Sequence, residues 1–127
     1  MKVDKIHQVA VFARELTEAI DFYTNILGAT FIARFDPPGI AFFDFNGTRI
    51  MLEAGAPKAS VYFRVDDIHA AFDELKAHGV TLIAEPQVIF RDETGMFGAA
   101  GEEEWMAFFS DPSDNTLALA SRQVKKD

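Results

Sequence analysis

Residues 15–28, with the sequence ELTEAIDFYTNILG, decide the fold because a second stretch further along the chain repeats their pattern. Apolar side chains recur three and four residues apart up to a final glycine, which predicts an amphipathic helix. Residues 67–79, DIHAAFDELKAHG, have the same spacing and also end at a glycine. Leu16 set against Ile68 aligns the two stretches at an offset of 52 residues, so the sequence predicts an internal duplication.

The residues on either side of the two helices repeat as well. Val9 falls on Val61 at the same offset, and Thr30 falls on Thr81 after the deletion of one residue. Each helix is followed by short β-rich segments that turn residues separate. Strands are predicted at 6–12, 29–35, 40–45, 48–53, 60–65, 80–90, 105–109 and 116–121, and helices at 15–27 and 68–78.

The predicted fold is α+β, with two tandem βαβββ modules at about residues 5–55 and 58–121. A length of 127 residues suits a single domain, 1–127, that contains both modules. A four-stranded sheet with one helix cannot bury both faces alone, so the modules should close on each other or on a partner chain. We therefore expect a curved mixed sheet around a cleft, with the helices outside.

Composition excludes several classes of function. A net charge of −8 argues against binding to nucleic acid and to anionic membrane surfaces, both of which require clustered positive charge. The absence of cysteine excludes disulfides, thiolate metal sites and cysteine nucleophiles. No apolar run is long enough to span a membrane, and no apolar signal segment follows Met1, so a cytoplasmic protein is expected.

Three signatures along the chain occur in the order found in one known family. They are residues 15–28 after the first strand, residues 63–68 before the second helix, and the closing hairpin 108–115, in which Asp114 replaces a usual glycine. Over about residues 5–121 the sequence resembles the vicinal oxygen chelate superfamily, which includes glyoxalases, bleomycin-resistance proteins, extradiol dioxygenases and methylmalonyl-CoA epimerases. The resemblance implies the fold and a homodimer, but no particular reaction, because this fold supports many.

The resemblance also implies where a metal would bind. Enzymes of this family chelate one divalent metal with four side chains, usually His and Glu, from four strands. The matching positions here are Gln8, Met51, Ser60 and Ala118. None is His, Asp or Glu, alanine cannot coordinate a metal, and a thioether is a poor ligand for Mg²⁺, Mn²⁺, Fe²⁺ or Zn²⁺. We therefore predict no metal ligands and no cofactor, although Gln does occur at the first position in some metal-bearing relatives.

Alternation along the strands predicts which side chains line the cleft. Val9, Val11, Ile50 and Leu52 should pack under the helices, which leaves a mixed polar and apolar set on the other face. The predicted ligand-binding residues are Gln8, Phe12, Arg49, Met51, Ser60, Arg64, Phe90 and Ala118.

Two residues of the predicted cleft have side chains that could act chemically. Glu53 shares the face of Met51 and could orient a ligand or act as a general base, form an ion pair with Arg49 or Arg64 at the rim, or bind a displaced metal. Tyr62 could donate a hydrogen bond to a ligand oxygen, or simply fill the space that a substrate would occupy.

Other segments leave similar alternatives open. His7 should point away from the cleft when Gln8 enters it, so it serves as a metal ligand only if the register slips. Residues 91–104 form the longest predicted gap in regular structure, either a mobile lid that carries Met96 and Phe97 or an elongated hairpin connection. The acidic triplet 102–104 is expected to face solvent, although Glu104 could turn inward, and the tail 122–127 is expected to fray.

The sequence therefore predicts a glyoxalase/bleomycin-resistance/dioxygenase-like protein that binds a small, partly apolar molecule in its cleft without the usual metal. The alternative is a metal-dependent lyase, epimerase or dioxygenase with non-standard ligands such as His7, Glu53 or Glu104. Whether any reaction is catalysed stays open at this point, with acid–base catalysis by Glu53 or Tyr62 as a further possibility.

Overall fold

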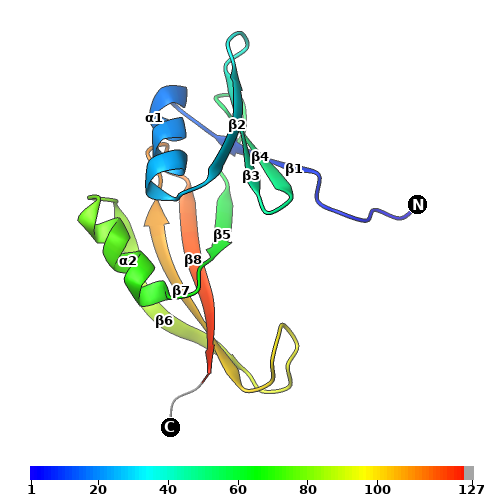
Figure 1. The fold of residues 1–127 in the computed structure, drawn as a ribbon, viewed down its shortest axis with the longest axis vertical. Coiled ribbons are helices and arrows are strands. Elements are labelled where there is room, and N and C mark those ends of the chain that lie inside the picture. The colour runs from blue at the N-terminus through cyan, green and yellow to red at the C-terminus, as the bar shows by residue number, and fades with distance from the viewer. Residues whose placement is uncertain (125–127) are drawn as a thin grey trace. The chain divides into compact units, whose positions relative to one another are not determined.

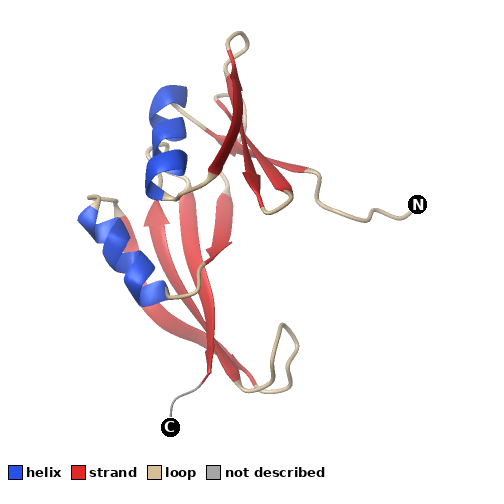
Figure 2. Cartoon of the chain, viewed as in Figure 1, coloured by secondary structure: helices blue, strands red, loops and turns tan. Residues whose placement is uncertain are grey.

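The computed structural model describes residues 1–124 and contains two four-stranded sheets, each with one helical segment against it (Figures 1 and 2). The strand orders are β1-β4-β3-β2 and β5-β8-β7-β6, so the two sheets have the same topology. In each sheet the first and last strands of the module run parallel, and the other neighbours are antiparallel. The predicted α+β class with tandem βαβββ modules is confirmed.

The chain divides into two compact units. The first comprises Met1–Ala59 together with Asp111–Asn115, and the second comprises Ser60–Ser110 and the chain from Thr116 onward. The elements of the first are β1 (Gln8–Phe12), α1 (Leu16–Asp21), a π-helix (Phe22–Ile26), β2 (Thr30–Phe35), β3 (Ile40–Phe45) and β4 (Thr48–Glu53). The elements of the second are β5 (Ser60–Arg64), α2 (Ile68–Ala77), β6 (Leu82–Asp92), β7 (Glu102–Ser110) and β8 (Thr116–Val124).

Both helices begin where an acidic side chain caps them. The Glu15 carboxylate accepts hydrogen bonds from the backbone of Thr17 and Glu18, and Asp67 accepts one from Ala70. The predicted helix 15–27 differs in one respect, because its second half is a π-helix rather than an α-helix. Gly28 and Gly79 both adopt positive φ after the helices, which explains why each helical pattern ends at a glycine.

Alternation along the strands separates a buried face from a partly exposed face, as predicted. Val11, Ile50 and Leu52 are buried under the helical segment of the first unit. Leu117 and Leu119 are buried in the same way in the second unit. The core of each unit therefore lies between its sheet and its helix, and the other face of each sheet carries the predicted cleft residues.

A buried polar turn between β7 and β8 packs within the first unit. The Tyr23 hydroxyl donates to Asp111 Oδ2 at 2.9 Å, and the Asn115 amide donates to the same oxygen at 2.8 Å. Asn115 also donates to the carbonyl of Phe12 at 2.7 Å and accepts from the N–H of Ala59 at 2.9 Å. Burial raises the pKa of Tyr23 well above its ordinary value, and the nearby Asp111 carboxylate raises it further. This turn fixes the end of β1.

The second unit corrects several sequence predictions. The hairpin strands are longer than expected, because β6 continues to Asp92, β7 begins at Glu102 and β8 runs to Val124. The gap predicted at 91–104 therefore shrinks to the loop 93–101. The predicted frayed tail is wrong for residues 122–124, which belong to β8, and residues 125–127 lie outside the described part of the chain. Within residues 1–124, no helix has the length and apolarity needed to cross a membrane.

Candidate functional site

The face of the first sheet opposite its helix carries most of the predicted site residues of this unit. Side chains on this face share three rows across β1, β4 and β3: Gln8–Arg49–Asp44, Ala10–Met51–Phe42 and Phe12–Glu53–Ile40. All of these residues are half-buried. The middle row is entirely apolar and the outer rows contain the charges, an arrangement typical of small-molecule sites.

Arg49 is held in place by its neighbours in the first row. Its Nε donates to Gln8 Oε1 at 2.8 Å, and its guanidinium lies over the ring of Phe42 at 5.4 Å. Its Nη2 lies 3.1 Å from His7 Nε2, a hydrogen bond when that nitrogen is unprotonated. Gln8 in turn directs its amide nitrogen to the sulfur of Met51 at 3.7 Å. These contacts join five side chains into one cluster: His7, Gln8, Arg49, Phe42 and Met51.

The residues at the family's metal positions do not fit a divalent metal. The oxygen of Gln8, the one atom of that side chain suited to a hard cation, already accepts from Arg49. A fixed guanidinium beside Gln8 also opposes a divalent cation there. Within residues 1–124, no three His, Asp or Glu side chains gather in a group that could hold a metal ion. His7, the alternative ligand, was expected to point away from this face but contacts Arg49 on it.

Glu53 lies at the opposite end of the same face. It is four residues from Arg49 along β4, which at about 3.3 Å per residue separates the two Cα atoms by about 13 Å. Arg49 donates to Gln8 instead, so the ion-pair alternative for Glu53 is not realised with Arg49. Among the described residues of the first unit, the carboxylate of Glu53 makes no ion pair.

The second sheet presents an equivalent face. The register pairs side chains in the rows Ser60–Thr116–Ser110, Tyr62–Ala118–Phe108 and Arg64–Ala120–Met106. Tyr62 is 54% exposed and packs its ring against Phe108 at 5.9 Å in an edge-to-face arrangement. Ala118 stands between them in this row and is only 1% exposed. Ser60 and Arg64 are exposed.

A polar network orders the end of the β6–β7 hairpin in the second unit. Arg122 on β8 donates to Asp92 Oδ2 at 2.7 Å and to Glu102 Oε1 at 3.0 Å, and lies 3.7 Å from Glu104. The backbone N–H groups of Met96 and Phe97 donate to Asp92 at 2.7 and 2.9 Å. The prediction that the acidic triplet faces solvent is therefore wrong for Glu102, and Glu104 follows the inward alternative, since both are half-buried against Arg122.

The electrostatics of this network favour its charged state. The hydrogen bond from the Phe97 N–H, together with those from Arg122 and Met96, lowers the pKa of Asp92 to about 2, although burial acts in the opposite direction. The same contact with Asp92 raises the pKa of Arg122. The loop 93–101 is thus tied to the sheet by its own backbone.

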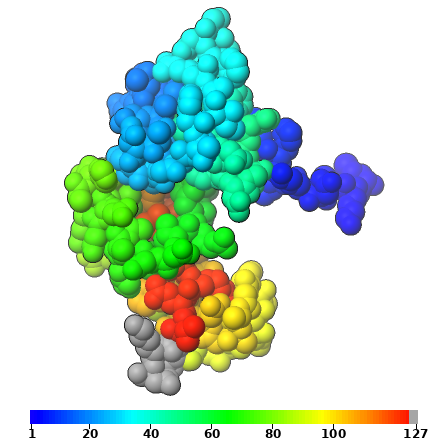
Figure 3. Space-filling model, viewed as in Figure 1, coloured from blue at the N-terminus to red at the C-terminus, as the bar shows by residue number. Residues whose placement is uncertain are grey.

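Two apolar side chains project from this tied loop. Met96 and Phe97 are exposed, and Phe97 contacts Phe90 edge-to-face at 5.7 Å. Figure 3 shows the loop, in yellow, at the surface. The hydrogen bonds that hold the loop agree with the alternative of an elongated hairpin connection. Its exposed apolar side chains agree with the alternative of a lid.

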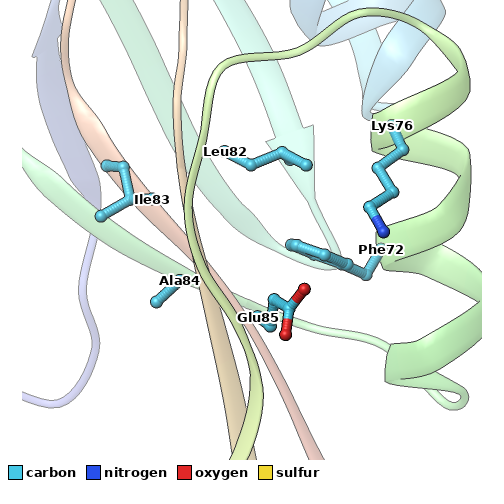
Figure 4. Close-up of a pocket in the computed structure, with 6 residues that line it drawn as sticks. All are labelled: Phe72, Lys76, Leu82, Ile83, Ala84 and Glu85. Carbon is cyan, nitrogen blue, oxygen red and sulfur yellow. The ribbon is translucent and has the colours of Figure 1, made fainter.

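A separate shallow pocket lies between α2 and β6 (Figure 4). Phe72 and Lys76 on the helix face Leu82 and Glu85 on the strand, and the volume is about 190 Å³. Typical ligand pockets measure roughly 300–1,000 Å³. None of the predicted site residues lines this pocket.

Sequence reasoning missed residues on the strands next to the predicted ones. Phe42 supports Arg49, and Phe108 packs on Tyr62. Both could have been found by continuing the alternation across the hairpin turns, since Phe42 pairs with Met51 and Phe108 with Ala118. The contacts of Arg122 had no comparable signal, because that residue was assigned to the tail.

Comparison with known proteins identifies the family. Residues 5–119 match the model of the Glyoxalase/Bleomycin resistance protein/Dioxygenase superfamily. The chain belongs to this superfamily. The resemblance to vicinal oxygen chelate proteins that the sequence predicted is thereby confirmed.

Similar proteins have names that describe different functions. A curated relative, the putative ring-cleaving dioxygenase MhqE of Bacillus subtilis, is 27% identical over an alignment of 140 positions that includes 94% of this chain. The chain spans only 42% of that relative's length. Among solved structures, the antibiotic-binding protein TnmS3 from Streptomyces sp. CB03234 matches with a TM-score of 0.76 and 19% identity, covering 97% of this chain and 99% of its own.

A second solved structure comes from a superfamily protein of Alicyclobacillus acidocaldarius. It matches with a TM-score of 0.67 and 23% identity, covering 94% of this chain and 92% of its own. At these identities both structures show the shared fold and nothing about a common ligand.

Proposed function

We propose that the protein binds a small, partly apolar molecule on the helix-free faces of its sheets, without the divalent metal used by enzymes of the superfamily. One observation carries the proposal: the oxygen of Gln8, at the first metal position, accepts a hydrogen bond from the guanidinium of Arg49. The oxygen that could bind a metal at this position is thus already bonded to a cation of the protein itself, and the other three positions are Met51, Ser60 and Ala118.

The chemistry of the two faces supports an organic ligand. Each has an apolar middle row, which presents Met51 and Phe42 in the first unit and Phe108, beside the buried Ala118, in the second. Polar groups stand beside these rows, including Glu53 and Tyr62, to which we assign ligand orientation. Apolar surfaces with a few fixed polar groups suit small molecules. The name of TnmS3, an antibiotic-binding protein, is consistent with this class of ligand.

A neutral fluorescent probe tests the proposal. N-phenyl-1-naphthylamine emits strongly only in apolar surroundings, so binding should raise its emission. The variant Met51→Glu should weaken probe binding about fivefold, because part of the roughly 1.5–3 kcal/mol gained by burying an apolar side chain is lost. Ala70→Glu, on the exposed side of α2, is the matched control and should leave binding unchanged.

The variant Tyr62→Glu extends this test to the second unit. Tyr62 is exposed, so the substitution should be tolerated, and circular dichroism checks the fold of each variant. The absence of an emission rise in the parent protein would count against the proposal. An equal loss for Ala70→Glu would do the same, because binding would then not depend on the helix-free faces.

A second candidate is a metal-dependent enzyme with non-standard ligands. The similarity to a putative ring-cleaving dioxygenase favours it, although the donor atoms at the expected positions do not. Elemental analysis of protein purified without chelator separates the two candidates. A stoichiometric transition metal would support the enzyme, and its absence after supplementation with Mn²⁺, Fe²⁺ and Zn²⁺ would support metal-free binding.

We also propose that the chain forms a homodimer. The edge strands β2 and β6 expose apolar side chains, among them Ile32 at 51% and Ile83 at 54%. Surface of this kind is often covered by a partner, because exposed edge strands promote association. Sedimentation equilibrium should give twice the chain mass, and Ile32→Lys or Ile83→Lys should shift it toward the monomer. A parent protein that stays monomeric at high micromolar concentration would contradict this.

A further inference from the structure

The charges of the chain single out Arg49. Four of the six arginines lie within 4.0 Å of a carboxylate: Arg14, Arg34, Arg91 and Arg122. Arg64 has no such partner among the described residues of the second unit, but it is exposed, so water solvates it. Arg49 is half-buried and has no carboxylate partner among the described residues of the first unit, whereas Arg122, which is also half-buried, has three within the second unit. The net charge of the protein is −8, so acidic side chains outnumber basic ones, and yet this guanidinium has no carboxylate as a counter-ion in its unit.

Nearby acidic groups do not neutralise Arg49. Asp44 is its cross-strand neighbour, but the Asp44 carboxylate turns to the backbone N–H of Gly47 at 3.1 Å. Glu53 lies at the far end of the face. Partial burial of an unpaired cation is unfavourable, and a bound anion would compensate for it.

The geometry of Arg49 is suited to receive such an anion. Gln8 accepts from Nε, His7 contacts Nη2, and Phe42 supports the plane of the guanidinium. These contacts fix the orientation of the group while occupying only two of its five N–H donors. A guanidinium held in this way has its remaining donors free for a planar, bidentate partner such as a carboxylate.

We propose that the ligand of the helix-free faces is an organic anion, an apolar ring or chain that carries a carboxylate, and that Arg49 binds the carboxylate. The apolar body lies on the Ala10–Met51–Phe42 row, which is next to Arg49 on the same face. Arg49 thereby provides the positive charge that a metal ion would supply in other members. This inference rests on the proposed function and specifies the chemical class of its ligand.

Two probes of equal shape but different charge test the inference. Calorimetric titration with 2-naphthoate and with neutral 2-naphthamide compares binding with and without the carboxylate. The parent protein should bind the naphthoate about tenfold more tightly, as expected for one partly exposed charge-assisted contact. Arg49→Gln should abolish this preference by weakening the binding of naphthoate.

Control variants separate the role of Arg49 from general electrostatics. Lys58→Gln makes the same charge change at an exposed position of the first unit and should preserve the preference. Arg49→Lys keeps the positive charge but cannot form the bidentate hydrogen bonds of a guanidinium. It should therefore keep part of the preference for naphthoate over naphthamide. Circular dichroism checks that each variant is folded.

The outcomes also separate this inference from the proposed function. If naphthamide binds and naphthoate binds no more tightly, the inference is wrong while the binding function stands. A preference that survives Arg49→Gln also overturns it, because the anion then binds elsewhere. If neither probe binds the parent protein at millimolar concentration, the proposed function itself fails.

Discussion

Replacing Asn115 by alanine should destabilise the first unit strongly, because its side chain joins three separate segments. The side chain is 0% exposed and makes hydrogen bonds to the carbonyl of Phe12, the N–H of Ala59 and the carboxylate of Asp111. Alanine removes all three bonds. It leaves the Phe12 carbonyl and the Ala59 N–H without their partner, and Asp111 with one donor fewer.

The magnitude follows from the cost of each lost partner. A buried polar group without a hydrogen bond costs about 1–3 kcal/mol, and Asp111 retains donors from Tyr23, Ser113 and the Asn115 backbone. We therefore expect a decrease of about 3–5 kcal/mol in the free energy of unfolding. With an unfolding entropy of about 2.1 cal/mol/K per residue, this lowers the melting temperature by roughly 10–20 °C.

Urea denaturation at 25 °C followed by circular dichroism measures this change. The neighbouring variant Asp114→Asn is the control, because it removes only the exposed ion pair with Arg14 and should change stability by less than about 0.5 kcal/mol. If Asn115→Ala lowered the free energy of unfolding by less than about 1 kcal/mol, the turn would not hold β1 in solution, contrary to this prediction.

Three further predictions concern the buried polar groups. Tyr23→Phe should lower stability at neutral pH by about 1.5–3 kcal/mol in urea denaturation. Because its pKa is raised on folding, Tyr23 stabilises the fold below about pH 10 and less as pH rises further, so the alkaline loss of stability should be smaller in the variant. Asp92, with its pKa lowered to about 2, stabilises the loop above about pH 4 and less as pH falls toward 2. Asp92→Asn should therefore speed proteolysis within residues 93–101 at neutral pH. The cleavage rate of the variant should also change less than that of the parent as the pH is lowered, and equal rates for parent and variant would contradict this. Gly98→Ala should also speed cleavage, because its Cβ would lie 2.7 Å from Arg122 Nε and displace the guanidinium from its carboxylates; unchanged cleavage would show that the loop is not anchored there.

Most of the fold could be predicted because its signals are local and repeated. The helical spacing before Gly28 and Gly79, and the alternation at Val11 and Leu52, depend on which side chains one element buries. The ends of β7 and β8 could not be predicted, because charged residues such as Glu102 and Arg122 indicate solvent when read alone. They extend a hairpin here because they neutralise each other across it.

The candidate site was predictable in its register and not in its contacts. Strand pairing placed Gln8, Arg49 and Met51 on one face, as expected. Whether Arg49 bonds to Gln8 or to Glu53 depends on side-chain rotamers and on distances, which the alternation of side chains along a strand does not determine. Sequence reasoning therefore found the cation but not its lack of a counter-ion.

We propose that an organic molecule, and not a metal ion, binds on the helix-free faces. The most direct test is a ¹⁵N–¹H correlation spectrum of the protein titrated separately with 2-naphthamide and with Zn²⁺ or Mg²⁺. We expect saturable naphthamide-dependent shifts in the strands that carry these faces, β1, β4, β5 and β8, with no stoichiometric response to either metal. Naphthamide shifts confined to α2 and β6, or a one-to-one metal response at Gln8 and Met51, would contradict the account.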